Sequence, residues 1–166
     1  RWRKNALYDI MDGKNGKLIT MLEQDPELKT WKCKQAGDEC FGFSLLHGAV
    51  RFGNHEALSL LLANGATDIT SLGKGGKTPF DMAIMASEPG MVAAMLDCAT
   101  AGTSKMPNLD KALRDAETQL EAANRSGSKV EDANQTRDLV LKLIEEAERK
   151  RRAEEEAAAA AAAEAQ

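Results

Sequence analysis

The sequence has few aromatic residues, few cysteines and no long apolar run, and each shortage excludes a class of protein. Aromatic side chains make up 4 % of the 166 residues, although 43 % are apolar. A core built mainly from Leu, Ala, Met and Ile suits packed helices better than a β-sandwich. Cys33, Cys40 and Cys98 are too few and too scattered for a disulfide framework, which favours a reducing compartment. Because no stretch of about 18 apolar residues occurs, we expect no transmembrane segment.

Basic residues are outnumbered as well. The chain has 22 Lys and Arg against 26 Asp and Glu, a net charge of −4. This balance argues against general binding to nucleic acid or to an anionic membrane. The chain starts at Arg1 rather than Met, so we expect a processed or trimmed product.

Composition changes near residue 100. Residues 1–100 contain every aromatic residue and every cysteine, whereas residues 101–166 contain none and are the more acidic part. Gly102 and Pro107 interrupt the stretch between them, which indicates a linker over residues 99–107. We expect a globular part over residues 5–98 and a helical extension over residues 108–166.

Two short helices are expected between residues 42 and 70. Leu46, Ala49 and Val50 share one helical face that ends at Gly53, and a second helix ends at Asn64-Gly65. Two such helices cannot bury both apolar faces alone, so the unit needs neighbouring copies. A copy is present further along the chain, where the run Gly76–Ile84 repeats the run Gly42–Val50. The spacing between these two runs, from residue 42 to residue 76, is called the repeat offset below.

This unit resembles the ankyrin repeat, a helix-turn-helix unit of about 33 residues with the signature Thr-Pro-Leu-His-x-Ala. Residues 44–49, Ser-Leu-Leu-His-Gly-Ala, stand at that signature, and residues 78–83, Thr-Pro-Phe-Asp-Met-Ala, match it with Asp81 in place of the histidine. A more divergent unit fits Ala6–Met11 with Gly13 after it. The resemblance implies an all-α solenoid of three repeats, with units at about 5–32, 42–70 and 76–98, and a longer first finger carrying Cys33 and Cys40.

Two features suggest a catalytic or metal site. Ser71–Thr78 is similar to a phosphate-binding loop, but that loop needs a preceding buried strand, which Asn64–Ile69 does not resemble. Cys33, Cys40, His47 and His55 follow one another at intervals of seven or eight, whereas structural zinc ligands usually pair two to five residues apart. We therefore expect no catalytic residue, no metal and no cofactor; a nucleotide-handling enzyme that uses the Gly73–Thr78 loop is the third hypothesis.

The extension indicates two helices, at about 108–124 and 129–166. In the first, an apolar seam has coiled-coil spacing: Leu109, Leu113, Ala116, Leu120 and Ala123. The second has an apolar stripe as far as Ala147, and beyond it come charge blocks and alanine, which favour a solvated helix.

The segment Met91–Ala99 is apolar nearly all round, so it needs a cover. We expect residues 108–123 to fold back as a cap on the third unit and residues 129–166 to project toward a partner. Truncation after Thr103 should then unfold the repeats, and truncation after Gly127 should spare the fold but abolish assembly.

The favoured function is a non-catalytic protein-protein interaction module, acting as an accessory or scaffold subunit of a larger complex. A chloroplast or mitochondrial assembly, photosynthetic or respiratory, is the expected setting; the alternative is a cytosolic adaptor or inhibitor that binds its partner reversibly. Four residues of the turn fingers and of the first helix in the middle unit are the expected partner-binding residues: Arg51, Phe52, Lys74 and Lys77. Phe52 is either an interface anchor or a packing residue against the neighbouring unit.

Overall fold

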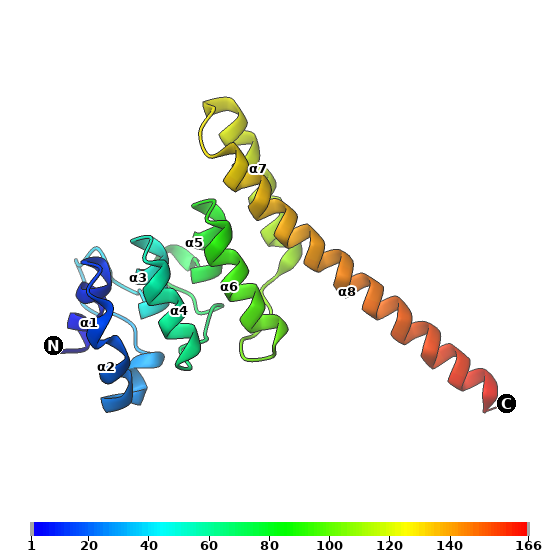
Figure 1. Cartoon of the computed structure of the whole chain (residues 1–166), viewed down its shortest axis with the longest axis horizontal. Helices are drawn as coiled ribbons and strands as arrows, with labels where there is room; N and C mark the ends of the chain where they lie inside the picture. Colours follow the sequence, from blue (N-terminus) through cyan, green and yellow to red (C-terminus); the bar gives the residue numbers. More distant parts are fainter. Residues whose placement is uncertain (1, 166) are drawn as a thin grey trace.

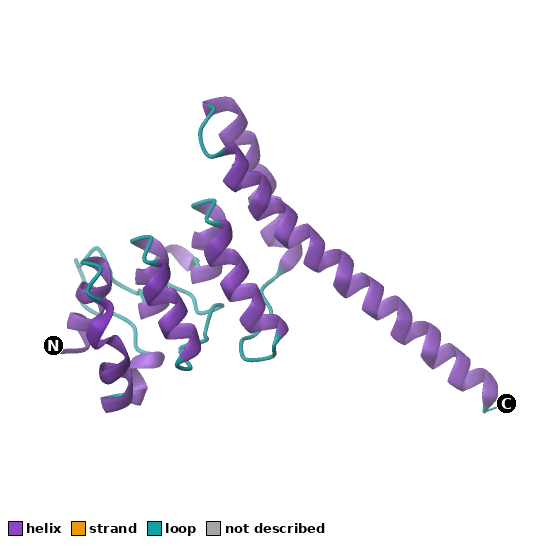
Figure 2. Ribbon diagram, viewed as in Figure 1, coloured by secondary structure: helices purple, strands orange, loops and turns teal. Residues whose placement is uncertain are grey.

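The computed structural model describes residues 2–165, and within them the regular secondary structure is helical, with loops and turns between the helices (Figures 1 and 2). The helices are α1 (Trp2–Met11), α2 (Leu18–Gln24), α3 (Leu45–Arg51), α4 (His55–Ala63), α5 (Pro79–Met85), α6 (Pro89–Thr100), α7 (Leu109–Ser126) and α8 (Val130–Glu164), with short 3-10 turns η1 (Asn15–Lys17), η2 (Pro26–Lys29) and η3 (Lys74–Gly76). Extended pairing in this part of the chain is limited to one isolated antiparallel bridge between Lys32 and Ser44. The prediction of an all-α fold is confirmed.

The helices form pairs that stack side by side (Figure 1). The first helices of successive pairs contact one another in the order α1, α3, α5 and α7, and the second helices do so in the order α2, α4, α6 and α8. The pair α7–α8 thus continues both rows of the stack, although its sequence has no repeat signature. The third pair is covered on its far side by the chain itself.

The close approach of α1 to α3 depends on a glycine in α3. A Cβ atom at Gly48, in the middle of α3, would lie 2.3 Å from Cδ1 of Leu7 on α1. Both Leu7 and its neighbour Ala6 are fully buried. Glycine inside a helix costs about 0.5–1 kcal/mol relative to alanine. The cost at Gly48 is offset by the packing of α1 directly onto α3.

The turns inside each pair require left-handed backbone. Gly53 joins α3 to α4 with φ 65°, and Gly65 follows α4 with φ 88°. Ser87, between α5 and α6, stands one repeat offset after Gly53, and it adopts φ 50°. The third pair therefore makes the same turn without glycine.

A helical cap packs on the third pair as predicted, but the helix that packs on Met91–Ala99 is α8 rather than residues 108–123, and the cap is larger than expected. Helix α7 contacts α5, and α8 contacts both α6 and α7. Ala133 and Thr136 of α8 are buried, and Val140 is fully so. The expectation that all of residues 129–166 project was therefore wrong, because only residues 145–165 are exposed throughout. Truncation after Gly127 removes core residues, so it should not spare the fold; residue 166 lies outside the described residues.

The contact surface of α7 differs in detail from the predicted seam. Ala112, Ala116 and Ala123 are buried, whereas Leu109 and Leu113 are partly buried and pack at the edge of the core. Alanines at the centre let α7 and α8 approach closely, and the leucines close the sides of the contact. The predicted seam omitted Ala112 because this residue does not fall on the coiled-coil spacing that runs through Leu109, Leu113 and Ala116.

Candidate protein-binding surface

The first helix of each of the last three pairs begins with a side-chain cap. Ser44 caps α3 and Thr78 caps α5, each in a reciprocal capping box with the residue three positions on. Asn108 caps α7 by accepting a hydrogen bond from Lys111 N at 3.0 Å. Such caps satisfy amide groups that a helix start leaves unpaired. They fix where each helix begins relative to the loop before it.

His47 is the third residue of α3 and connects two pairs. The backbone N–H of Ser44 donates to His47 Nδ1 at 3.1 Å, and Nε2 lies 3.0 Å from the carbonyl oxygen of Lys77. A backbone amide only donates, so Nδ1 is the acceptor and the proton sits on Nε2, which donates to Lys77. Burial lowers the pKa of His47 and keeps this neutral form. Both ring nitrogens are occupied, so His47 acts as a structural tie.

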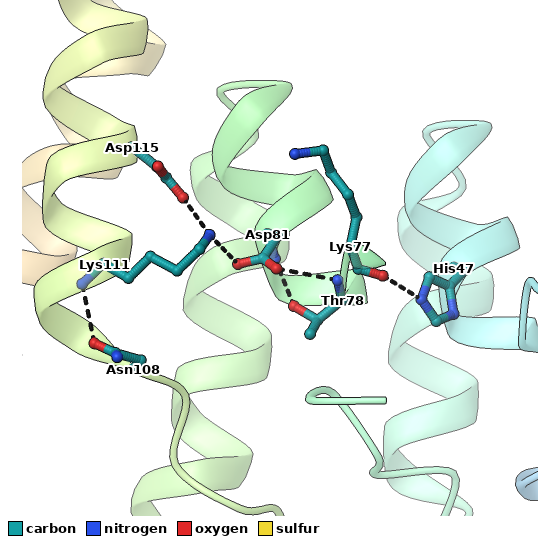
Figure 3. A network of polar contacts seen from close by, with 7 residues as sticks. All are labelled: His47, Lys77, Thr78, Asp81, Asn108, Lys111 and Asp115. Carbon is teal, nitrogen blue, oxygen red and sulfur yellow. Dashed lines mark hydrogen bonds and ion pairs between the residues drawn. The ribbon is translucent and has the colours of Figure 1, made fainter. Parts of the chain in front are cut away.

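Asp81 holds the corresponding position on α5 and makes the corresponding connection to α7 (Figure 3). One carboxylate oxygen accepts from Thr78 N at 3.1 Å, and the other accepts from Lys111 Nζ at 3.2 Å. Lys111 also donates to Asp115 at 2.6 Å, and this bond is the main cause of its raised pKa. His47 faces a backbone carbonyl of the next pair, whereas Asp81 faces the ammonium group of Lys111. A carboxylate accepts a hydrogen bond from this ammonium group, so aspartate suits residue 81 better than histidine.

Two loops, here called the first finger (residues 32–44) and the second finger (residues 69–78), lie against each other. A Cβ atom at Gly42 would lie 3.0 Å from Lys74 N, and one at Gly73 would lie 2.6 Å from His47 Nε2. Lys32 Nζ donates to the Leu72 carbonyl at 2.7 Å. Glycine is therefore required at residue 42, where the fingers meet, and at residue 73, where the second finger passes His47 of α3.

The loop that is similar to a phosphate-binding loop uses its amides internally. The N–H of Gly73 donates to Lys77 O at 2.8 Å, that of Gly76 donates to Gly73 O at 3.1 Å, and that of Thr78 donates to Asp81. Within residues 2–165 no strand precedes this loop. A phosphate cradle needs amides that point at the anion, and these amides point into the loop.

The four predicted binding residues are not all in one place. Arg51 and Lys77 line the same shallow hollow of about 270 Å³ between α3 and α5. Lys74 begins η3 on the second finger and does not line this hollow. Phe52 caps the end of α3, is half-buried and packs against the core. Phe52 was interpreted either as an interface anchor or as a packing residue, and the structure shows it in packing contact with the core.

Methionine side chains form the apolar part of the hollow. Met82 and Met85 of α5 line it, together with Val50 and Ala86. Met85 is 42 % exposed, an unusual position for a large apolar side chain. The sequence prediction did not include these methionines. A signal for one of them was present, since Met85 stands one repeat offset after Arg51.

A second hollow of about 310 Å³ adjoins the first across α5 and reaches α7. The two share Met85 and Ala86, and the second also includes Gln119 and Lys129. Lys129 Nζ donates to the Ala86 carbonyl at 3.1 Å and lies 3.4 Å from a carboxylate oxygen of Glu88. Together the hollows form one shallow groove over α3, α5 and α7, here called the groove.

The other candidate ligands do not form a centre. Cys33 and Cys40 are buried free thiols of the first finger. His55 lies 3.4 Å from Glu88, at the opposite end of the first helices from His47. No group of three His, Cys, Asp or Glu residues able to hold a metal ion occurs among the residues described. The described helices also include none with the length and hydropathy needed to cross a membrane.

Comparison of the chain with protein-family models, with curated proteins and with solved structures finds no match in any of the three.

Proposed function

We propose that this chain is a protein-binding module of the ankyrin-repeat type, non-catalytic, and a subunit or accessory factor of a larger protein assembly. The stacked helix pairs support the repeat type, as do the repeat offset between the second and third pairs and the tie from His47 to the next pair. The pair α7–α8 serves as the C-terminal cap. Such stacks bind through rigid preformed surfaces rather than through chemistry.

The observation that carries the proposal is the hollow between α3 and α5. It brings together Arg51 and Lys77 from two successive pairs and adds the exposed side chain of Met85. Neither cation has a hydrogen bond or an ion pair from its side chain to any other residue of the described chain. Arginine and methionine are both enriched at protein interfaces, and Arg51 and Met85 meet in this hollow. Met85 on this surface is an apolar group that the fold itself leaves uncovered.

Binding is tested by pull-down with the purified full chain and with a double variant, Arg51→Glu with Met85→Glu. Both side chains are exposed, so the variant should fold with an unchanged circular dichroism spectrum. We expect it to lose a protein that the native chain retains. Ser59→Glu with Lys150→Glu, on α4 and on the far half of α8, is the matched control and should retain it. Retention of the partner by the groove variant would place the binding surface elsewhere.

Size-exclusion chromatography of native material separates the two forms of this function. A stable complex of high mass indicates a permanent subunit, which is the proposal. A free monomer of 17.9 kDa indicates the reversible adaptor instead.

A further inference from the structure

We propose that the groove binds an acidic peptide segment in extended conformation, with one apolar side chain of that segment inserted beside Met82 and Met85. This inference rests on the proposed function, since it specifies the chemistry of the partner at the same surface. Three properties of the groove support it: its charge, its apolar floor and its direction.

The charge of the groove is opposite to that of the chain. The chain has more acidic than basic residues, yet no Asp or Glu lines either hollow. The charged residues that line them are Arg51, Lys77 and Lys129. Lys129 is held by Glu88 and by the Ala86 carbonyl, whereas the side chains of Arg51 and Lys77 remain unpaired within the described chain. In Figure 3 the ammonium group of Lys77 lies apart from the other labelled polar groups. No carboxylate therefore lines the two hollows themselves, and Glu88 beside them is paired with Lys129.

The apolar floor requires an apolar side chain on the ligand. Met82 and Met85 flank the hollow beside Val50, and methionine adapts its shape to different apolar groups. Burial of a leucine-sized side chain stabilises a complex more than a surface ion pair does. Acidic groups alone would therefore bind weakly, and the inserted side chain is needed for retention.

The direction of the groove suits an extended segment. It crosses α3, α5 and α7, and axes of packed helices lie about 8–10 Å apart, so the groove spans roughly 16–20 Å. An extended chain covers this length with about five or six residues at roughly 3.3 Å each. The groove has no aromatic lining on which bases would stack. A peptide therefore fits the groove better than a nucleic acid does.

The test uses the full chain with ¹³C-methyl-labelled methionine and follows its methyl signals by NMR during titration. The probe is the peptide Glu-Glu-Asp-Leu-Glu-Asp-Glu. We expect the signals of Met82 and Met85 to shift and that of Met106 to stay, since Met106 is 41 % exposed but lies outside the groove. Signals are assigned by single Met→Leu variants.

Three comparison probes separate the contributions. The amide peptide Gln-Gln-Asn-Leu-Gln-Asn-Gln tests charge, the peptide with Gly in place of Leu tests the apolar anchor, and a single-stranded oligonucleotide tests nucleic acid. Each should bind at least about tenfold more weakly than the acidic leucine peptide. Arg51→Gln with Lys77→Gln should weaken that peptide by about tenfold, whereas Lys105→Gln with Lys150→Gln, which removes the same charge elsewhere, should not.

Equal binding of the amide peptide, shifts confined to methionines outside the groove, or tighter binding of the oligonucleotide would each overturn the inference. If these results occur while the pull-down still depends on Arg51 and Met85, the binding surface stands and only its ligand chemistry is wrong. If the pull-down also fails, the proposed function fails with it.

Discussion

A single protonation at His47 is expected to control part of the stability of the stack. His47 is fully buried, and its neutral Nδ1 accepts from Ser44 N. Burial lowers its pKa below the ordinary 6.5, so the unfolded chain binds a proton more readily than the folded chain. The contribution of His47 to the free energy of unfolding should therefore be complete above pH 6.5. It should decrease as the pH falls toward the pKa of His47 in the folded chain.

The measurement is urea unfolding of the native chain and of His47→Gln at pH 7.5 and at pH 5.5. Loss of two buried bonds should cost the variant about 2–4 kcal/mol at pH 7.5, because each unsatisfied buried group costs about 1–3 kcal/mol. The variant should also lose less stability than the native chain between the two pH values. Equal losses in both proteins would show that folding leaves the pKa of His47 unchanged, which would contradict this account.

Ser87 is expected to carry backbone strain that glycine would relieve. It adopts φ 50° at the turn where the preceding pair has Gly53. Left-handed backbone costs a non-glycine residue about 1–2 kcal/mol, and the greater freedom of unfolded glycine offsets about half of the gain. Ser87→Gly should raise the free energy of unfolding by about 0.5–1 kcal/mol, measured by thermal melting. Ser87→Ala keeps the strain and should not stabilise; an equal gain from both variants would contradict this reason.

Among the elements, α8 is divided into a packed half and a free half. Helix α8 packs on α6 and α7, and its Val140 is fully buried, whereas the next residue, Leu141, is 37 % exposed. Val140→Asp places a carboxylate in the core and should cost about 3–5 kcal/mol, while Leu141→Asp should cost less than about 1 kcal/mol. Denaturant unfolding of the two variants compares neighbouring residues on one helix. Similar costs would mean that α8 does not cap the stack.

The free half of α8 is expected to exchange its amide hydrogens much faster than the packed half. Residues 145–165 are exposed throughout, and surface ion pairs four residues apart support them, such as Arg151 with Glu155. A helix without tertiary contacts is only marginally stable, and such pairs add about 0.3–0.5 kcal/mol each. Hydrogen exchange followed by NMR should show protection over residues 133–143 and little beyond residue 150. Equal protection would indicate that a second copy covers the free half.

Element boundaries within the repeats could be predicted because glycines and caps mark them directly. Gly53 and Gly65 end the helices of the middle pair, and Ser44 begins the first of them. The end of the packed half of α8 was close to predictable, because its apolar stripe stops at Ala147 and residues 145–165 are exposed. The surface that the stripe covers could not be predicted, because an apolar stripe packs equally well on α6 or on another chain.

At the scale of the whole molecule, the groove was predicted only in part. Arg51 was identified from its place before Gly53 and Lys77 from its place on the second finger, but their meeting at one hollow depends on how two pairs stack. Met85 was missed because hydropathy does not separate an exposed methionine from a buried one; only its place one repeat offset after Arg51 marks it in the sequence. The binding function, in turn, remains a proposal that the shape and charge of the groove support.

Photo-cross-linking from the groove tests that proposal most directly. A benzoylphenylalanine at position 85 faces the hollow, whereas one at position 59 lies on an exposed part of α4 away from it. Both chains are expressed in the native host, irradiated and analysed by mass spectrometry. We predict a cross-link from position 85 to one other protein, lost when Arg51→Glu is added, and none from position 59. A cross-link from position 59 alone, or equal products from both positions, would contradict a partner-binding groove over α3, α5 and α7.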